Sequence, residues 1–187
     1  MCVSSRKRCV TASRIFKAID EKVAMKSPQK SRFGKLVTYL LDPQSKQKTR
    51  VGEVVITNCV STGTTWAVRE IAATQWLNTR AKSARTYQLI ISLRAGANPE
   101  AQTLRMIEER FCKALGNAEH QRISVVHHDT DNMHIHVAIN KIHPTTFTLH
   151  NPGCDYKTRK ICSSIFQNTF ADVRLFQKET SGRLDEL

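Results

Sequence analysis

The alternation of residues between 126 and 144, VHHDTDNMHIHVAINKIHP, constrains the fold of this chain more than any other feature. Residues 133–142 follow the two-residue period of a β-strand. One face of this strand carries apolar side chains, with Lys141 at its end: Ile135, Val137, Ile139 and Lys141. The opposite face carries His134, His136, Ala138 and Asn140. The pattern therefore predicts a strand with one core face and one face that presents imidazoles.

A second short strand is predicted at 121–127, and the turn-forming residues 129–132 connect the two strands as a hairpin. This hairpin brings His127 or His128 across from the other two histidines, and strand alternation alone does not choose between them. Three imidazoles on one sheet face indicate a metal site with open coordination positions, which is the catalytic arrangement. Imidazole suits zinc, copper, nickel, iron and manganese better than magnesium. The alternative is a surface hairpin whose histidines merely alternate, and the apolar reverse face argues against it.

The charge of the chain indicates a polyanionic partner. The 187 residues carry a formal net charge of +13, and 40% of them are hydrophobic, as in a globular protein. Nucleic acid fits this surplus better than a membrane surface does, and the basic residues are spread over several segments, as expected for a surface that follows a phosphate backbone.

The six cysteines contain no Cys-x-x-Cys pair, which predicts free thiols in a reducing cytoplasm. No segment has the length and apolar content of a membrane span, and the N-terminus lacks the apolar core of a signal peptide. We therefore expect a soluble intracellular protein.

Helical and strand patterns mix along the chain, which predicts a single α+β domain with one antiparallel sheet and helices packed on a face. Helices are predicted at 15–24, 31–42, 64–78, 98–116 and 156–170, and further strands at 50–60 and 84–93. Asn98 is the predicted cap of the fourth helix and Gly116 its stop. The expected organisation is a basic N-terminal extension at 1–24, the domain at 25–170 and an atypical tail at 171–187.

A basic protein with a three-histidine site suggests metal-assisted chemistry on a phosphodiester. The nucleophile could be a water molecule or a side chain, and a side chain would give a covalent intermediate. The candidates are Tyr39, Tyr87 and Tyr156. Tyr87 is predicted in the core, and a helical tyrosine such as Tyr39 usually packs, so position alone does not decide.

Three motifs resemble those of conjugative relaxases of the P mobilisation class (TraI/MobA type), within the HUH endonuclease superfamily. The run from His127 to Asn140 is similar to the family's third motif, HxDxxNxHxHxxxN. Leu36–Asp42 looks like the helix with the nucleophilic tyrosine, and Thr86–Gly96 looks like the second motif. The resemblance covers roughly residues 24–165 and implies a ferredoxin- or RRM-like sheet.

This resemblance implies a role for individual residues. Tyr39 would attack one phosphate and leave a 5′-phosphotyrosine with a free 3′-hydroxyl. The implied ligands of a divalent cation, Mg²⁺ or Mn²⁺, are His127, His134 and His136. Asp129 would orient a histidine, Ser92 would contact DNA at the cut, and Asn140 would support the site. We also expect DNA contacts from four basic residues: Arg80, Arg94, Arg122 and Lys141.

The implied function is strand-specific nicking and rejoining of single-stranded DNA at a plasmid origin of transfer. Accessory relaxosome proteins and a type IV secretion coupling protein are the implied partners. The implied location is the bacterial cytoplasm, with export to the recipient cell on covalently attached DNA. One alternative is a rolling-circle initiator or transposase of the same superfamily, in which the tyrosine commonly follows the histidine motif. The other is a truncated, non-catalytic DNA-binding remnant, because residues 171–187 do not look like the family's continuation.

Overall fold

The computed structural model describes residues 32–42, 50–93, 96, 98–128, 133–152 and 173–174. The elements in chain order are α2 (Arg32–Leu41), β1 (Val51–Thr57), α3 (Thr64–Leu77), β2 (Thr86–Leu93), α4 (Ala101–Ala114), β3 (Arg122–His127), β4 (His134–Asn140) and β5 (Val173–Arg174). The predicted α+β class is confirmed. The helices predicted at 15–24 and 156–170 lie outside the described residues.

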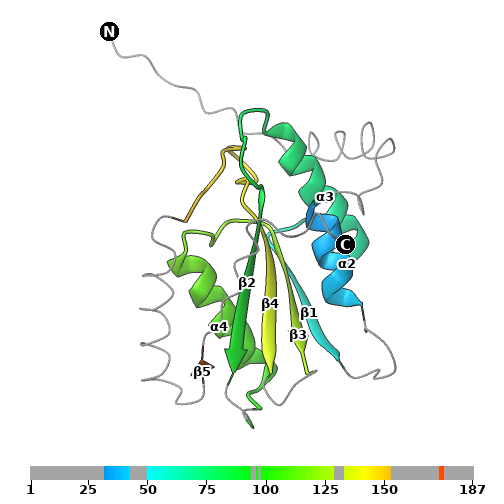
Figure 1. Ribbon diagram of the computed structural model, residues 1–187, viewed down its shortest axis with the longest axis vertical. Coiled ribbons are helices and arrows are strands. Elements are labelled where there is room, and N and C mark those ends of the chain that lie inside the picture. Colours follow the sequence, from blue (N-terminus) through cyan, green and yellow to red (C-terminus); the bar gives the residue numbers. More distant parts are fainter. Residues whose placement is uncertain are drawn as a thin grey trace.

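The strands form one sheet in the order β1-β3-β4-β2-β5, and all neighbouring strands pair antiparallel (Figure 1). The predicted hairpin is the central β3–β4 pair, in which His127 is directly opposite His134. On the other side of β4, Ser92 of β2 is also opposite His134. The register therefore aligns three of the predicted site residues in one row across the sheet.

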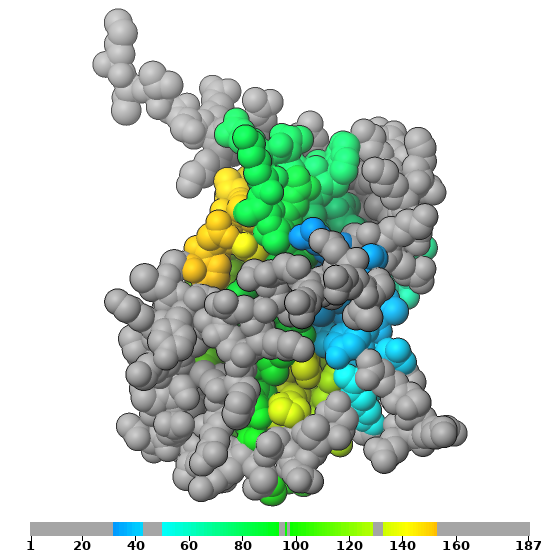
Figure 2. All heavy atoms as spheres, in the orientation of Figure 1, coloured from blue at the N-terminus to red at the C-terminus, as the bar shows by residue number. Residues whose placement is uncertain are grey.

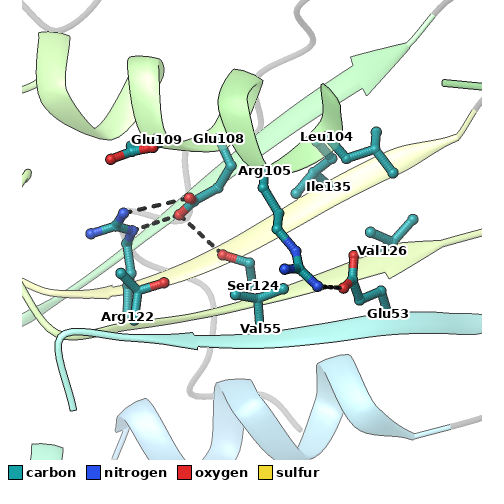
Figure 3. A pocket seen from close by; sticks show the side chains of 11 residues that line it. Glu53, Val55, Leu104, Arg105, Glu108, Glu109, Arg122, Ser124, Val126 and Ile135 are labelled. Carbon is teal, nitrogen blue, oxygen red and sulfur yellow. Dashed lines mark hydrogen bonds and ion pairs between the residues drawn. The ribbon is translucent and has the colours of Figure 1, made fainter. Parts of the chain in front are cut away.

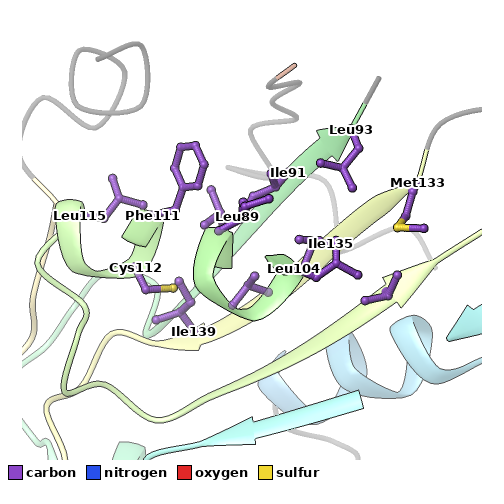
Figure 4. Packing of buried hydrophobic residues seen from close by; sticks show 13 residues of the cluster. Leu89, Ile91, Leu93, Leu104, Phe111, Cys112, Leu115, Met133, Ile135 and Ile139 are labelled. Atoms are coloured by element: carbon purple, nitrogen blue, oxygen red, sulfur yellow. The ribbon is translucent and has the colours of Figure 1, made fainter. Parts of the chain in front are cut away.

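Helices cover both faces of the sheet, whereas the sequence predicted them on one (Figure 1). Helix α4 packs on the face formed by Ile135, Val137 and Ile139 (Figure 4). Helices α2 and α3 pack on the opposite face, against Ile123, Val125 and Ala138. The difference arises because the imidazole face is itself apolar beyond the histidines, so it also has to be covered.

The boundaries of α4 differ from the prediction at one end. Glu100 occupies the N-cap position without a side-chain capping hydrogen bond, two residues after the predicted cap Asn98. At the other end Gly116 has a φ of 75°, and its N–H donates to the carbonyl of Lys113 at 3.0 Å. Glycine adopts this left-handed conformation without the usual steric cost, so the predicted stop is confirmed.

Two of the cysteines, Cys59 and Cys112, lie among the described residues, and both are free thiols. Burial, with a smaller contribution from Glu70, raises the pKa of Cys59 to about 12. Burial and Glu108 raise the pKa of Cys112 as well. Such thiols stay protonated and unreactive at neutral pH. No helix in the described ranges combines the length and hydropathy needed to cross a membrane.

A buried ion pair connects α4 to β3 within a groove of about 220 Å³ (Figure 3). Nε of Arg122 donates to Oε1 of Glu108 at 2.6 Å, and the Ser124 hydroxyl donates to the same oxygen at 3.1 Å. Arg122 is only 2% exposed, and it donates also to the carbonyl of Ala118. The structure therefore differs from the predicted DNA contact: this guanidinium is already paired inside the protein and does not face solvent.

We predict that Arg122→Ala lowers the free energy of unfolding by about 3–5 kcal/mol, because it leaves the Glu108 carboxylate buried without its counter-charge. Urea unfolding followed by circular dichroism measures this change. The matched control is Arg105→Ala, which removes an exposed arginine of α4, the helix that carries Glu108. Arg105 pairs with Glu53 at the surface, and little change is expected. Unchanged stability of the Arg122 variant, together with weaker DNA binding, would contradict the structural role.

Candidate active site

The site residues form a row at one end of the sheet. Ser92, His134 and His127 are aligned across β2, β4 and β3, so their side chains lie on the same face. His136 lies one pleat further along β4 on the same face. Ser92 is 1% exposed, and its hydroxyl has a long contact of 3.4 Å with the carbonyl of Leu93.

The three imidazoles lie close together. The ring centroids of His127 and His136 are 4.3 Å apart, and those of His134 and His136 are 6.1 Å apart. His128 is exposed and lies beside the backbone of Gly52, so it faces away from this cluster. The structure therefore selects His127 over its neighbour where alternation alone left the choice open.

His127 connects the imidazole cluster to helix α2. Its side chain is fully buried, and Nε2 lies 2.7 Å from the carbonyl oxygen of Leu40. A carbonyl only accepts hydrogen bonds, so Nε2 carries a proton and the lone pair of the neutral ring is on Nδ1. The histidine strand thereby holds the last turn of the helix that carries Tyr39.

Tyr39 lies one residue before this contact, and its side chain is 46% exposed. The guanidinium of Arg50 lies 5.6 Å from the centre of the tyrosine ring. The same guanidinium donates to the carbonyl of Asp42 at 3.3 Å, just beyond the end of α2. The phenol is thus accessible to a ligand and has a positive charge beside it.

Gln88 is a member of the site that the sequence analysis did not single out. Its amide nitrogen lies 3.5 Å from Nδ1 of His136, a contact that can orient the imidazole. The signal was available, because strand alternation places Gln88 and Ser92 on the same face of β2. Arg50 was missed because its basic segment gave no indication of a particular partner.

The imidazole cluster has suitable donors for a cation, but its side chains do not converge on one point. Among the residues that the structure describes, no group of three or more His, Cys, Asp or Glu side chains is placed to hold a metal ion. The donor set therefore fits a metal in its chemistry, and the side-chain positions would have to adjust to bind it. The predicted residues Asp129 and Arg94 lie outside the described part of the chain.

Asn140, Arg80 and Lys141 lie at the other end of the sheet. Asn140 is six residues along β4 from His134, a distance of about 20 Å at the rise of a β-strand. It is buried, where its amide donates to Gln121 and its Oδ1 accepts from the N–H of Ile142. The structure therefore gives Asn140 a role in this distant turn network, unlike the supporting role at the imidazoles that the sequence predicted.

A second group of histidines lies at this far end. The ring of His120 is 5.2 Å from that of His143 and 5.5 Å from that of His150. His120 is buried, and its Nδ1–H donates to the carbonyl of Asn140 at 2.6 Å. Burial is the main cause that lowers the pKa of His120, and the neighbouring histidines lower it further.

The α+β fold presents three histidines on an antiparallel sheet, beside a helix with an exposed tyrosine. This arrangement is the one expected of a histidine-containing nicking endonuclease. Residues 39–169 match the family model described as Relaxase: MobA/VirD2-like, nuclease domain. The match covers more than half of the chain, and the chain belongs to this family. The resemblance stated from the sequence motifs is confirmed.

Curated relatives agree with this assignment. The chain is 49% and 51% identical to two proteins named TraI from Escherichia coli, each over 148 residues. It is 32% identical over 100 residues to a protein named MobA from Acidithiobacillus ferrooxidans. The TraI alignments cover 79% of this chain but 20% of each relative, so the chain spans about a fifth of their length. The MobA alignment covers 52% of this chain and 24% of that relative. No solved structure gives a significant match.

The His120 group predicts a loss of stability in mild acid. Because the pKa of His120 is lowered in the folded state, the unfolded chain binds more protons. Stability is therefore full above the ordinary histidine pKa of about 6.5 and falls as the pH drops toward the lowered value. The charged or titratable groups around it are His143, His150 and Glu119. Urea unfolding midpoints test this dependence when they are measured from pH 8 to pH 5 at intervals of about half a pH unit.

The variant His120→Asn is the comparison for this titration. It keeps a donor for the Asn140 carbonyl but no longer titrates, so its midpoint should be lower at pH 8 and should fall less on acidification. Parallel pH profiles of the two proteins would rule out His120 as the source of the acid sensitivity.

Proposed function

We propose that this domain nicks and rejoins one DNA strand at a plasmid origin of transfer, with Tyr39 as the nucleophile. The observation that supports this most is the link between His127 and Leu40, which ties an accessible tyrosine to a cluster of three imidazoles. The family assignment supports the same chemistry, because its description is that of a relaxase nuclease domain. It does not favour a rolling-circle initiator, a transposase or a non-catalytic remnant.

In the proposed reaction the phenolic oxygen of Tyr39 attacks the phosphorus of one phosphodiester. An oxygen–phosphorus bond to the tyrosine forms, and the bond from phosphorus to the 3′-oxygen breaks. The phenol loses its proton and the departing 3′-oxygen gains one, so the products are a 5′-phosphotyrosine and a 3′-hydroxyl. A covalent phosphodiester is kept throughout, so the same step can run backward and rejoin the strand. Arg50 would place a positive charge beside the ring of the attacking tyrosine.

The proposed cofactor is a divalent cation, Mg²⁺ or Mn²⁺, held by His127, His134 and His136. Relaxase nucleases generally use a divalent metal. A cation bound there would polarise a non-bridging phosphate oxygen and neutralise developing charge. Asp129 would orient one of the imidazoles, and Gln88 would hold the ring of His136 in place.

Ser92 and Arg94 would contact the DNA near the cut, because Ser92 lies in the row with His134. Ser92 is 1% exposed, so this contact requires the side chains that cover it to move when DNA binds. The proposed site of action is the bacterial cytoplasm, followed by transfer into the recipient on the attached strand. Relaxosome accessory proteins and a type IV secretion coupling protein are the proposed partners, in keeping with the TraI and MobA relatives.

Tyr39→Phe should abolish covalent attachment to DNA, by at least about 10³-fold, because it removes the attacking oxygen. The full chain is incubated with a pool of randomised single-stranded oligonucleotides and Mn²⁺, and adducts that survive SDS are counted and sequenced. DNA affinity should stay within about twofold, because phenylalanine keeps the ring. The matched control is Tyr87→Phe, a tyrosine that packs against the α4 core, and it should keep the adduct. Equal adduct yields from wild type and Tyr39→Phe would refute the assignment.

His134→Ala should weaken Mn²⁺ binding by more than about tenfold, because it removes one of three proposed ligands. Isothermal titration with MnCl₂ in the absence of DNA measures this directly and does not depend on activity. The control is His143→Ala, which removes a histidine of the distant group. If both variants bound Mn²⁺ as the wild type does, the three-histidine site would have to be abandoned.

A further inference from the structure

A second polar hollow lies at the end of the sheet away from the imidazoles. The segments 77–83 and 146–149 line it, and its volume is about 700 Å³. Figure 2 shows the orange atoms of the later segment next to green atoms in the upper half of the view. Asn78 holds the two segments together, since its Nδ2 donates to the Phe147 carbonyl at 2.6 Å and its Oδ1 accepts from the N–H of Ala81 at 2.7 Å.

The lining of this groove is basic and rich in hydroxyl groups. Arg80 and Lys82 are both exposed, and the hydroxyl side chains are those of Thr79, Ser83, Thr146 and Thr148. The residues that line the groove include neither aspartate nor glutamate. Guanidinium, ammonium and hydroxyl groups without an acidic neighbour are the donors that bind phosphate oxygens along a nucleic acid strand.

Phe147 gives the groove an aromatic member in an unusual conformation. Its φ is 54°, which is rare for a bulky residue and is stabilised here by a bond from its N–H to the carbonyl of His143. Strained residues of this kind concentrate at ligand sites. Proteins that bind single strands combine such an aromatic ring, on which a base stacks, with a positively charged groove.

We infer that this groove binds the DNA strand at a distance from the cut, with phosphates on Arg80 and Lys82 and a base against Phe147. The inference rests on the proposed function for the identity of the ligand. Along the sheet the groove lies about 20 Å from the imidazole row. That length corresponds to on the order of six nucleotides of a stacked strand, and to fewer when the single strand is extended, so the two sites would hold different parts of one strand.

The test compares the affinities of labelled oligothymidylates by fluorescence anisotropy at several salt concentrations. An oligomer of about three nucleotides is too short to occupy both sites even when fully extended, and one of about twenty can span them. Wild type should bind the long oligomer more tightly and with a steeper salt dependence. In Arg80→Ala/Lys82→Ala the slope of log K against log salt should become shallower by about 1.4, which is 0.7 for each lost phosphate contact.

Phe147→Gly provides a second, independent variant. Glycine accepts the positive φ without strain, so the turn should persist while the stacking surface is lost. Affinity for the long oligomer should fall about tenfold. The control Arg110→Ala/Lys113→Ala removes two exposed basic residues of α4 that do not line the groove. The increase in affinity from the short to the long oligomer should be the same as in wild type.

If the groove variants gained as much affinity with length as wild type, with the same salt slope, the inference would be overturned. Adduct formation is measured separately in the wild type and in the control Arg110→Ala/Lys113→Ala, and both proteins should form the adduct. If the wild type bound long oligomers more tightly than short ones but formed no adduct, the proposed function would be refuted. The inference that the groove binds DNA would still be supported.

Discussion

The pairing register of β3 and β4 determines which side chains meet at the imidazole end of the sheet. His127 is opposite His134, and the same register places Val126 and Ile135 together on the face under α4. If β4 slipped by one residue, His134 and His136 would turn toward α4, and the isoleucines of β4 would turn toward α2 and α3. Both faces are covered by helices, so such a shift would expose or misplace core residues on two sides at once. The packing of the whole domain therefore protects the alignment of a few polar side chains.

The two ends of the sheet use their polar residues differently. At the far end, Gln121 bonds to Glu70 and to Asn140, and Glu70 also accepts from the backbone N–H groups of Val60 and Ser61. These groups satisfy one another and fix the loops. At the imidazole end the three rings lie close together, and the described residues there are not placed as a metal cage; an accessible phenol lies on the helix bonded to His127. The imidazole end combines clustered ring nitrogens with an exposed phenol, so chemistry is expected there.

Much of this arrangement could be predicted from the sequence because periodicity reports which face a residue occupies. The alternation in residues 133–142 gave the correct faces of β4, and the stop at Gly116 followed from its need for a positive φ. Position along a strand, however, is not contained in the period. Asn140 shares a face with His136 but lies at the opposite end, and Arg122 has a buried partner, Glu108, from another element. Tertiary partners of this kind become visible only when helix and sheet are assembled.

The hydrogen bond between Nε2 of His127 and the Leu40 carbonyl links β3 directly to α2. A change that tilts α2 would also move the ring of His127. A change in β3 would move Leu40, the residue next to Tyr39. Substitutions in the two elements should therefore show non-additive effects, as is typical of residues in direct contact. The acceptor is a main-chain oxygen, so this bond depends on the path of the helix backbone and survives a change of side chain at position 40.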